Sequence, residues 1–340
     1  MVAAARAAVV CGLGTHLPPR VVTNAELARE VDTSDEWIRS RTGIGRRHIA
    51  ENGTATSDLA VEAGQRALKS ASASGSAVAV DAVIVATTTP DHPCPATAPA
   101  VAARLGLGTV PAFDVGAVCT GFLYGLAAGG GLIAAGTAHG VLVIGAETYS
   151  SILDPADRST RAIFGDGAGA VVLRAGEPDE PGALGPLVLG SDGTGSDLIR
   201  VPSGGSRDPV RPGHADRADP YFRMAGSKVF RNAVERMAEA SQEAATRAGW
   251  TLQDIDVFVV HQANLRIMNA VADQMRLPRS RFPVHLDRVG NTAAASIPLA
   301  LADAVTTGAL RPGQRTALAA FGGGLTWGAA TLTWPDITPV

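Results

Sequence analysis

Cysteine and aromatic residues are both scarce in this chain. Its 340 residues include three cysteines, Cys11, Cys94 and Cys119, with no Cys-x-x-Cys pair. That pattern argues against a disulfide framework and against a cysteine-rich zinc site, so we expect no metal and a reducing cytoplasm. Only 4% of the residues are aromatic, whereas 46% are hydrophobic. The hydrophobic share is enough for a large core and favours two similar halves over one small domain.

The chain also lacks a strong net charge and a membrane-length apolar run. Its formal net charge is −3, which gives no electrostatic argument for nucleic acid binding. Residues 1–14 are apolar, but Arg6 interrupts them and Pro18 and Pro19 follow. This segment is too short to span a membrane and predicts a first strand rather than a signal peptide. We therefore expect a cytoplasmic protein without a membrane segment.

The two halves of the chain repeat one order of elements. Apolar runs predict a buried strand over 80–86 in the first half and a similar strand over 255–261 in the second. A loop and a predicted helix follow each strand, and Asp81 and Asp256 stand at the same place near the two strand starts. The predicted helices cover residues 96–105 and 264–275.

Cys119 and Asn291 each begin an Ala-rich helix that leads into a buried strand, and their separation nearly equals that between the two aspartates. Chance similarity is the alternative, but the shared order of elements argues against it. If the halves are duplicates, both residues occupy equivalent helix starts and a pseudo-twofold axis brings them to one site. Strands that are apolar on both faces belong in sheets covered by helices on each side. We predict a layered α/β protein with two sheets, central helices and halves at 1–185 and 186–340.

Cys119 is the candidate nucleophile. It follows a predicted strand over 111–115 and precedes a predicted helix over 121–135. At a helix N-terminus, unpaired N–H groups and the helix dipole stabilise a thiolate. The alternative is a buried, inert cysteine, which is the commoner state and the one we assign to Cys11, inside an apolar strand.

His261 and Asn291 are the candidate partners of this cysteine. Among seven histidines, only His261 ends a buried strand and enters a polar loop, the place where α/β proteins put their chemistry. A hydrogen-bonded structural histidine is the alternative there. Asn291 follows Gly290, and its alternative role is a helix N-cap.

Residues 165–170 match the Gly-x-Gly-x-x-Ala fingerprint of dinucleotide-binding proteins. An apolar run at 171–173 comes next and predicts a strand. The fingerprint requires a helix N-terminus to hold the pyrophosphate. We therefore reject nucleotide binding at this motif.

Six short motifs occur in order along the chain: DEWI at 35–38 with RTGI at 41–44, VCTGF at 118–122, FGDGAGA at 164–170, HQANLRI at 261–267, GNT at 290–292 and FGGGLTWG at 321–328. Together they resemble the β-ketoacyl-acyl-carrier-protein synthase III family over nearly the whole chain, from about Gly12 to Leu332. The resemblance implies the thiolase fold, five αβαβα layers built from two pseudo-duplicated halves, and a homodimer.

The resemblance also implies a two-stage condensation. Cys119 takes an acyl group from acyl-CoA as a thioester, and malonyl-acyl carrier protein then loses CO2 and attacks it. Neutral donors at His261 Nε2 and Asn291 Nδ2 stabilise the enolate oxygen. The backbone N–H groups of Cys119 and Gly323 form a second oxyanion hole, for the acyl carbonyl.

The resemblance also implies which residues contact CoA and which contact a carrier protein. Trp37 stacks on the adenine, Arg41 and Arg158 lie near the nucleotide and its phosphates, and Asn264 bonds the pantetheine. CoA thioester is a substrate, and no cofactor is bound permanently.

Arg231 and Arg266 match basic positions that meet the acidic acyl carrier protein. The chain departs from the family pattern at Asp273 and Gln274, which stand where lysine is common.

Cys94 is the residue on which primer choice depends. By resemblance it reaches across the dimer and caps the partner's acyl pocket, and its small size predicts propionyl, isobutyryl or somewhat longer primers. A fatty-acid initiator and a priming ketosynthase for aromatic polyketides such as R1128 both stay open. The rival of another class is an acyltransferase that moves an acyl group from cysteine to an alcohol or amine; a non-enzymatic scaffold is a third alternative.

Overall fold

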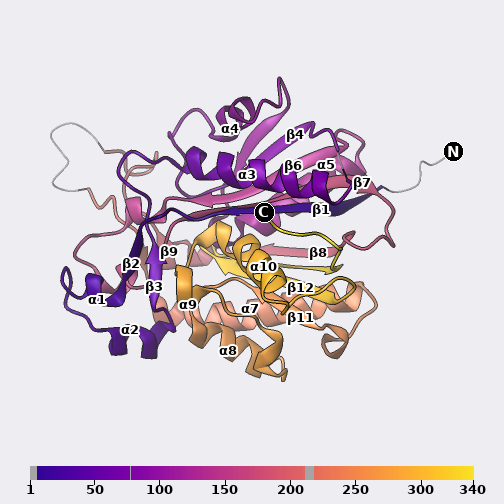
Figure 1. The fold of residues 1–340 in the computed structure, drawn as a ribbon. Helices are drawn as coiled ribbons and strands as arrows, with labels where there is room; N and C mark the ends of the chain where they lie inside the picture. The colour runs from indigo at the N-terminus through magenta and orange to yellow at the C-terminus, as the bar shows by residue number, and fades with distance from the viewer. Residues whose placement is uncertain (1–5, 77, 211–217) are drawn as a thin grey trace.

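The computed structural model describes residues 6–76, 78–210 and 218–340 and places them in five layers (Figure 1). The first sheet has the strand order β1-β7-β6-β4-β5. Strands β1 and β6 both run antiparallel to β7, while β4 is parallel to β6 and β5. These strands are β1 (Ala7–His16), β4 (Ala82–Ala86), β5 (Ala112–Val115), β6 (Gly140–Glu147) and β7 (Gly167–Gly176).

The second sheet has the order β11-β12-β13-β8. Strands β11 and β12 are parallel, and the other two pairs are antiparallel. The strands are β8 (Leu184–Ser191), β11 (Val257–Val260), β12 (Arg315–Gly322) and β13 (Thr326–Thr333). Buried Val, Ile, Leu and Ala on both strand faces explain why helices cover each sheet on both sides.

Helices form the remaining three layers. Two lie between the sheets, where their apolar side chains share one core with both: α5 (Gly121–Ala134) and α10 (Ser296–Thr306). The outer face of the first sheet is covered by α3 (Thr56–Ala73) and α4 (Ala98–Arg104). The outer face of the second is covered by α7 (Gly226–Arg247) and α8 (Leu265–Gln274). The predicted five-layer thiolase fold is confirmed.

Small elements flank the layers and carry part of the site. They are β2 (Val21–Thr23), α1 (Asn24–Leu27), α2 (Asp35–Thr42), β3 (Arg46–His48), α6 (Arg158–Arg161), β9 (Ile199–Arg200), β10 (Arg223–Met224) and α9 (Leu286–Val289). Strand β1 confirms the predicted first strand from residue 7 onward, and residues 1–5 of that prediction lie outside the described residues. No helix in the described residues is long and apolar enough to cross a membrane.

Glycine brings the central helix α5 close to the first sheet. A Cβ atom at Gly125 would lie 2.8 Å from Val143 Cγ1, and one at Gly129 would lie 3.2 Å from Val141 Cγ1. Larger side chains there would push the helix off β6. The Ala- and Gly-rich composition therefore decides how closely the layers pack.

The duplication is more regular than the sequence suggested, and it corrects one prediction. One constant offset relates the first residues of β4 and β11, of β6 and β12, and of α5 and α10. The same offset relates Val118 to Ala293, and both have positive φ, 47° and 44°.

This offset pairs Cys119 with Ala294, so the prediction that Asn291 occupies the equivalent helix start is wrong. Asn291 lies instead in the loop before the 3-10 turn over Ala293–Ala295 that leads into α10. The proposed boundary at 185/186 falls within β8 and stays a prediction.

Candidate active site

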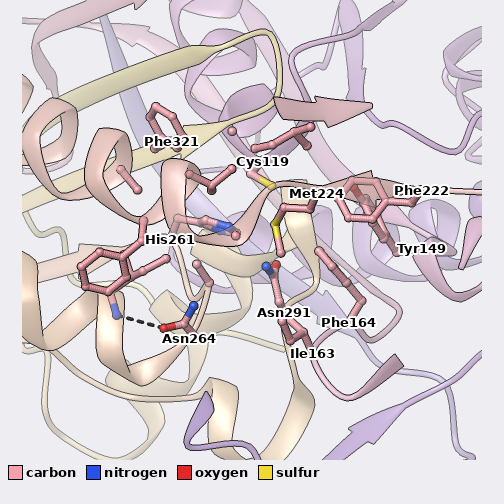
Figure 2. A pocket seen from close by; sticks show the side chains of 18 of the residues that line it. Cys119, Tyr149, Ile163, Phe164, Phe222, Met224, His261, Asn264, Asn291 and Phe321 are labelled. Carbon is pink, nitrogen blue, oxygen red and sulfur yellow. Dashed lines mark hydrogen bonds between the residues drawn. The ribbon is translucent and has the colours of Figure 1, made fainter. Parts of the chain in front are cut away.

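One buried cavity of about 150 Å³ brings together residues from both halves. Cys119, His261, Asn291 and Asn264 all line it. Figure 2 shows Cys119 at the centre, Asn264 on the His261 side, and Tyr149 and Phe222 on the other side. Cys119 is far from the other three in sequence, so only the fold makes them neighbours.

Cys119 lies in a 3-10 turn over Val118–Thr120 that leads directly into α5. The residue is buried, with 8% of its surface exposed to solvent. Gly322, at the end of β12, abuts it: a Cβ atom there would lie 2.9 Å from the Cys119 backbone nitrogen. Glycine at 322 is therefore needed for the second sheet to approach the nucleophile.

The acidity of Cys119 differs from the expectation of a thiolate stabilised by the helix. Burial raises the pKa of the Cys119 thiol to about 12, and the negative charge of Glu147 acts in the same direction. Desolvation disfavours the charged form of a buried group. Cys119 therefore rests as a thiol, and the helix start alone does not determine its ionisation.

His261 follows β11 directly and is 2% exposed. Burial lowers the pKa of the imidazole to about 4, so the ring is neutral near pH 7. Its Nδ1 lies 2.6 Å from Ser296 Oγ, and this oxygen also accepts a hydrogen bond from the Gln262 backbone N–H at 3.3 Å. The proposed role of His261 as an Nε2 donor requires the Nε2–H tautomer. In that tautomer the Ser296 hydroxyl donates to Nδ1 while its oxygen accepts from Gln262.

Asn291 is held on three sides. Its backbone N–H donates to Ile163 O at 2.9 Å, and its carbonyl accepts from the Gly165 N–H at 3.0 Å. Its side-chain Oδ1 accepts from the Ala293 N–H at 2.9 Å. Asn291 therefore uses its side-chain oxygen for the capping role that the sequence left open. Its Nδ2 amide group stays available to the cavity.

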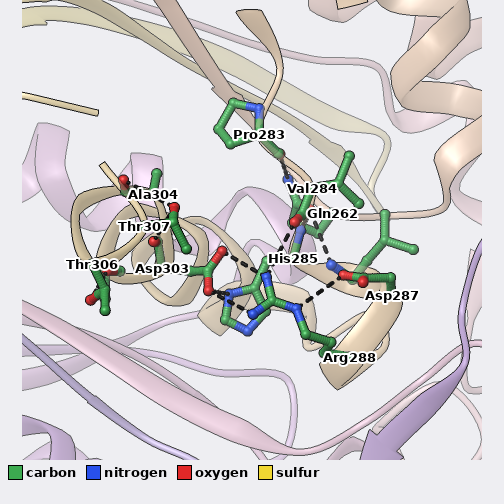
Figure 3. Close-up of polar contacts among 12 residues, drawn as sticks. Gln262, Pro283, Val284, His285, Asp287, Arg288, Asp303, Ala304, Thr306 and Thr307 are labelled. Carbon is green, nitrogen blue, oxygen red and sulfur yellow. Dashed lines mark hydrogen bonds and ion pairs between the residues drawn. The ribbon is translucent and has the colours of Figure 1, made fainter. Parts of the chain in front are cut away.

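Gln262 connects the strand that carries His261 to the segment that leads to Asn291. Its Nε2 donates to Val260 O at 2.9 Å and to Pro283 O at 3.3 Å, and its Oε1 accepts from His285 N at 2.9 Å and Leu286 N at 3.3 Å (Figure 3). The side chain is buried, so these bonds have no competition from water.

An ion pair extends this connection to α10. Arg288 on α9 donates to both carboxylate oxygens of Asp303 on α10, at 2.9 and 2.8 Å (Figure 3). The helix that carries Ser296 is thereby tied to the segment before Asn291.

Gly323 lies next to the cavity rather than in its lining. A Cβ atom at Gly323 would contact Val118 and Ile199 side chains at 3.2 and 3.1 Å. The residue adjoins the turn that carries Cys119, and its role in an oxyanion hole stays a prediction.

Three predicted CoA residues lie together at the surface. The guanidinium carbons of Arg41 and Arg158 lie 5.2 and 5.0 Å from the centre of the Trp37 ring. Arg158 also donates to the Asp32 carbonyl at 2.5 Å. Asn264, the fourth, caps α8 by accepting from Ile267 N at 2.9 Å, which leaves its amide nitrogen facing the cavity.

The predicted carrier-protein residues are on neighbouring helices. Arg231 on α7 and Arg266 in the first turn of α8 are both exposed. Asp273, one of the departures from the family pattern, forms an exposed ion pair with Arg279 at 2.7 Å. Arg279 therefore offsets part of the negative charge that Asp273 adds.

Cys94 does not line the cavity within one chain. It is exposed, in the loop between β4 and α4. The loop is anchored at Asp91, whose Oδ1 accepts from Ser57 N at 2.9 Å and whose N–H donates to Thr97 Oγ1 at 3.1 Å. Its capping of a partner's pocket stays a prediction.

Sequence reasoning missed several residues that shape the site, namely Ser296, Gln262, Tyr149 and Glu147. Glu147 ends β6 fully buried and accepts hydrogen bonds from Thr88 N at 3.0 Å and Thr89 Oγ1 at 2.9 Å. Burial raises the pKa of its carboxyl to about 7. An acid in an apolar strand is a signal that the sequence carries; a serine or glutamine partner gives no such signal.

Comparison with known proteins agrees with this geometry. A family model described as 3-oxoacyl-(acyl-carrier-protein) synthase III matches residues 113–193, and its C-terminal counterpart matches residues 245–334. The β-ketoacyl-(acyl-carrier-protein) synthase III 3 of Streptomyces coelicolor is 66% identical over 338 residues, which cover 98% of this chain and 99% of that protein.

Two solved structures are also similar. The 3-oxoacyl-(acyl carrier protein) synthase III of Pseudomonas aeruginosa PAO1 has a TM-score of 0.91 and 52% identity, and the match covers 98% of this chain and 100% of that one. The priming β-ketosynthase from the R1128 polyketide biosynthetic pathway has a TM-score of 0.90 and 36% identity, with 99% and 98% covered.

Proposed function

The chain belongs to the 3-oxoacyl-(acyl-carrier-protein) synthase III family, and we propose that it condenses an acyl-CoA primer with malonyl-acyl carrier protein. The products are 3-oxoacyl-acyl carrier protein, CoA and CO2. One observation carries the proposal: a thiol, a neutral imidazole and a primary amide from three segments line one buried cavity. No Asp, Glu, Lys or Arg is among the described residues of that lining.

In the first stage, the Cys119 sulfur forms a bond to the acyl carbonyl carbon and the bond to the CoA sulfur breaks. The thiol proton leaves with CoA, so the step is balanced without an outside acid or base. Because Cys119 rests as a thiol, its deprotonation belongs to the transfer step itself. Gly323, with the Cys119 N–H, is the proposed donor pair for the carbonyl oxygen.

In the second stage, malonyl thioester loses CO2 and its enolate carbon forms a bond to the acyl carbonyl carbon. The bond from that carbon to the Cys119 sulfur breaks, and the released thiolate takes a proton from solvent, which restores the resting thiol. A weakly basic, neutral His261 suits this step, because it donates from Nε2 to the enolate oxygen and does not protonate the carbanion. Asn291 Nδ2 is the second donor. Removal of one such donor typically lowers the rate by about 10² to 10³.

Residues at the surface and at the cavity mouth suit the CoA and carrier-protein parts of the two substrates. The Trp37, Arg41 and Arg158 cluster offers an aromatic face and two cations for a nucleotide and its phosphates, and Asn264 is placed for pantetheine. The exposed Arg231 and Arg266 suit an acidic carrier protein. We propose that CoA thioester is a substrate rather than a resident cofactor, and that these substrates place the reaction in the cytoplasm.

A homodimer is part of the proposal. In the described residues, β5 pairs with β4 on one side and leaves its other edge open, with Phe113 37% exposed. An open edge strand is a template for pairing with another chain. Pairing there would bring the nearby Cys94 loop to the partner.

The reaction initiates chains, either of fatty acids or of polyketides. Its S. coelicolor relative is named a β-ketoacyl synthase III, and the R1128 neighbour is a priming ketosynthase. An acyltransferase acting on an alcohol or amine would have no enolate to stabilise, which disfavours that alternative at a site with two neutral donors.

Separate assays of the two stages test the function. Cys119→Ser should form no acyl-enzyme with acetyl- or isobutyryl-CoA, because a serine hydroxyl without a base is a poor nucleophile. His261→Ala and Asn291→Ala should keep acyl transfer and lose malonyl decarboxylation by about 10² or more. Intact-mass measurement reports the first stage and CO2 release the second. An acyl adduct on another residue, or equal losses in both assays, would contradict these roles.

A further inference from the structure

Tyr149 lines the cavity and carries a buried hydroxyl. The residue begins a 3-10 helix over Tyr149–Ile152, directly after β6, and is 0% exposed. Its ring stacks on Phe164 with centroids 4.5 Å apart and meets Phe222 edge-on at 5.3 Å. Its hydroxyl oxygen is buried and has no hydrogen-bond partner among the described residues.

This hydroxyl differs from the other polar groups of the cavity. The side chains of His261, Asn291 and Asn264 each have one atom already bonded to the protein. A buried hydroxyl without a partner destabilises a protein, so native structures rarely retain one without a reason. A ligand that completes the bond is such a reason.

The position of Tyr149 assigns it to the acyl end of the site. Figure 2 shows Cys119 between Asn264 on one side and Tyr149 with Phe222 on the other. Asn264 caps α8, next to the exposed Arg266, so the CoA arm is expected from that side. An acyl group held on Cys119 then extends toward Tyr149, among aromatic and aliphatic side chains.

The hydroxyl acts as a donor. Burial raises the pKa of Tyr149 well above its ordinary value, so the proton stays on the oxygen. The described lining contains no Arg or Lys that could neutralise a carboxylate. A charged primer would therefore be buried without a counter-ion, whereas a neutral oxygen would be accepted.

We propose that Tyr149 is a specificity-determining residue that favours primers with a neutral oxygen acceptor, that is, hydroxyacyl- or oxoacyl-CoA, over the plain alkanoyl-CoA primers that the site also takes. This inference rests on the proposed acyl transfer to Cys119. The oxygen of the primer accepts the Tyr149 hydrogen bond, and the aromatic wall holds the rest of the chain.

Matched primer pairs test this inference: lactoyl-CoA against propionyl-CoA, and each enantiomer of 3-hydroxybutyryl-CoA against butyryl-CoA. The wild-type protein should acylate Cys119 with at least one hydroxyl primer about tenfold more efficiently, in kcat/KM, than with its partner lacking the hydroxyl. Tyr149→Phe, which keeps the ring, should abolish that ratio.

The matched control is Tyr124→Phe, because the Tyr124 hydroxyl donates to Gly190 O at 2.9 Å outside the cavity. This variant should keep the wild-type ratio. A wild-type preference for the plain primer in every pair, or a Tyr149→Phe effect equal on both members, would overturn the inference. Absence of acylation by every CoA thioester would instead contradict the proposed function itself.

Discussion

At the scale of single residues, burial makes both Cys119 and His261 harder to ionise. The thiol of Cys119 becomes a weaker acid and the imidazole of His261 a weaker base, because both charged forms lose hydration. Proton transfer from the cysteine to the histidine is therefore unfavourable at rest. This arrangement suits His261 as a neutral donor, and the Ser296 hydroxyl is placed to stabilise the Nε2–H tautomer that this role requires.

The contact between Ser296 and His261 predicts a selective defect. Ser296→Ala removes the hydroxyl that holds Nδ1 at 2.6 Å, so the ring loses its preference for the Nε2–H form. We expect malonyl decarboxylation to fall by about tenfold, while acyl transfer from CoA stays within about twofold. Nitrogen chemical shifts of the imidazole should report a mixed tautomer population. An unchanged tautomer with an equal loss in both stages would indicate general disruption of the fold instead.

The high pKa of Cys119 predicts how its alkylation depends on pH. Below a pKa of about 12, the thiolate fraction increases about tenfold for each pH unit. In a Cys94→Ser background, iodoacetamide labelling of Cys119, measured by peptide mass spectrometry, should rise in this way from pH 7 to 9 without a plateau. A plateau within that range would mean that the start of α5 stabilises the thiolate more than burial opposes it.

At the scale of elements, the two proposed donors lie at a junction of three segments, next to the turn that carries Cys119. His261 directly follows β11, Asn291 follows α9, and Ser296 begins α10. Gln262 joins the first segment to the second, and the ion pair between Arg288 and Asp303 joins α9 to α10. Such cross-links explain how catalytic groups on different elements keep one geometry.

The buried amide of Gln262 predicts a stability cost at this junction. Gln262→Ala leaves the N–H groups of His285 and Leu286 without an acceptor. The apparent free energy of unfolding in urea should fall by about 2–3 kcal/mol, and condensation should fall with it as Asn291 loses its support. The control is Gln242→Ala on the exposed face of α7, with an expected change under about 0.5 kcal/mol. Equal changes in the two variants would contradict the cross-link.

At the scale of the whole molecule, the duplicated halves build a site from loops that are not duplicates of each other. One constant offset relates the strands and central helices of the two halves. The catalytic positions break it, since Asn291 lies before Ala294, the residue that corresponds to Cys119. In the proposed dimer the partner chain also contributes to the site, because the exposed Cys94 would cap the partner's acyl pocket.

The Cys94 loop predicts primer choice across the dimer. Cys94→Phe should fill space in the pocket and lower use of propionyl- or isobutyryl-CoA by about five- to 150-fold, while acetyl-CoA is spared. Competition assays with mixed acyl-CoAs measure this ratio.

A heterodimer shows whether Cys94 caps the acyl pocket of its own chain or that of the partner. In a dimer of one Cys94→Phe chain and one Cys119→Ser chain, the single active Cys119 faces the unaltered Cys94 of its partner. It should keep broad primer use. Restriction as strong as in the Cys94→Phe homodimer would refute the cross-dimer cap, and equal effects on acetyl and isobutyryl groups would place Cys94 outside the pocket.

Hydrophobic patterns and short motifs were enough to predict the layered fold, the order of its elements and three catalytic candidates. Strands apolar on both faces required helices on both sides, and they appear as β4, β6, β11 and β12. Cys119, His261 and Asn291 stood out because each lies within a short motif that resembles one family, which is local information. The strand predicted after the motif at 165–170 is confirmed, since β7 covers Gly167–Gly176.

The acid–base properties and hydrogen-bond partners of those residues depend on contacts that form only in the folded chain. Burial is a sum over distant segments, so no local pattern could show that the thiol pKa is raised or that the imidazole pKa is lowered. Ser296 lies 35 residues from His261 in sequence, and Tyr149 reaches the cavity only because β6 ends beside Cys119. Partners of this kind are set by packing between layers, where ordinary serines and tyrosines acquire a role through position alone.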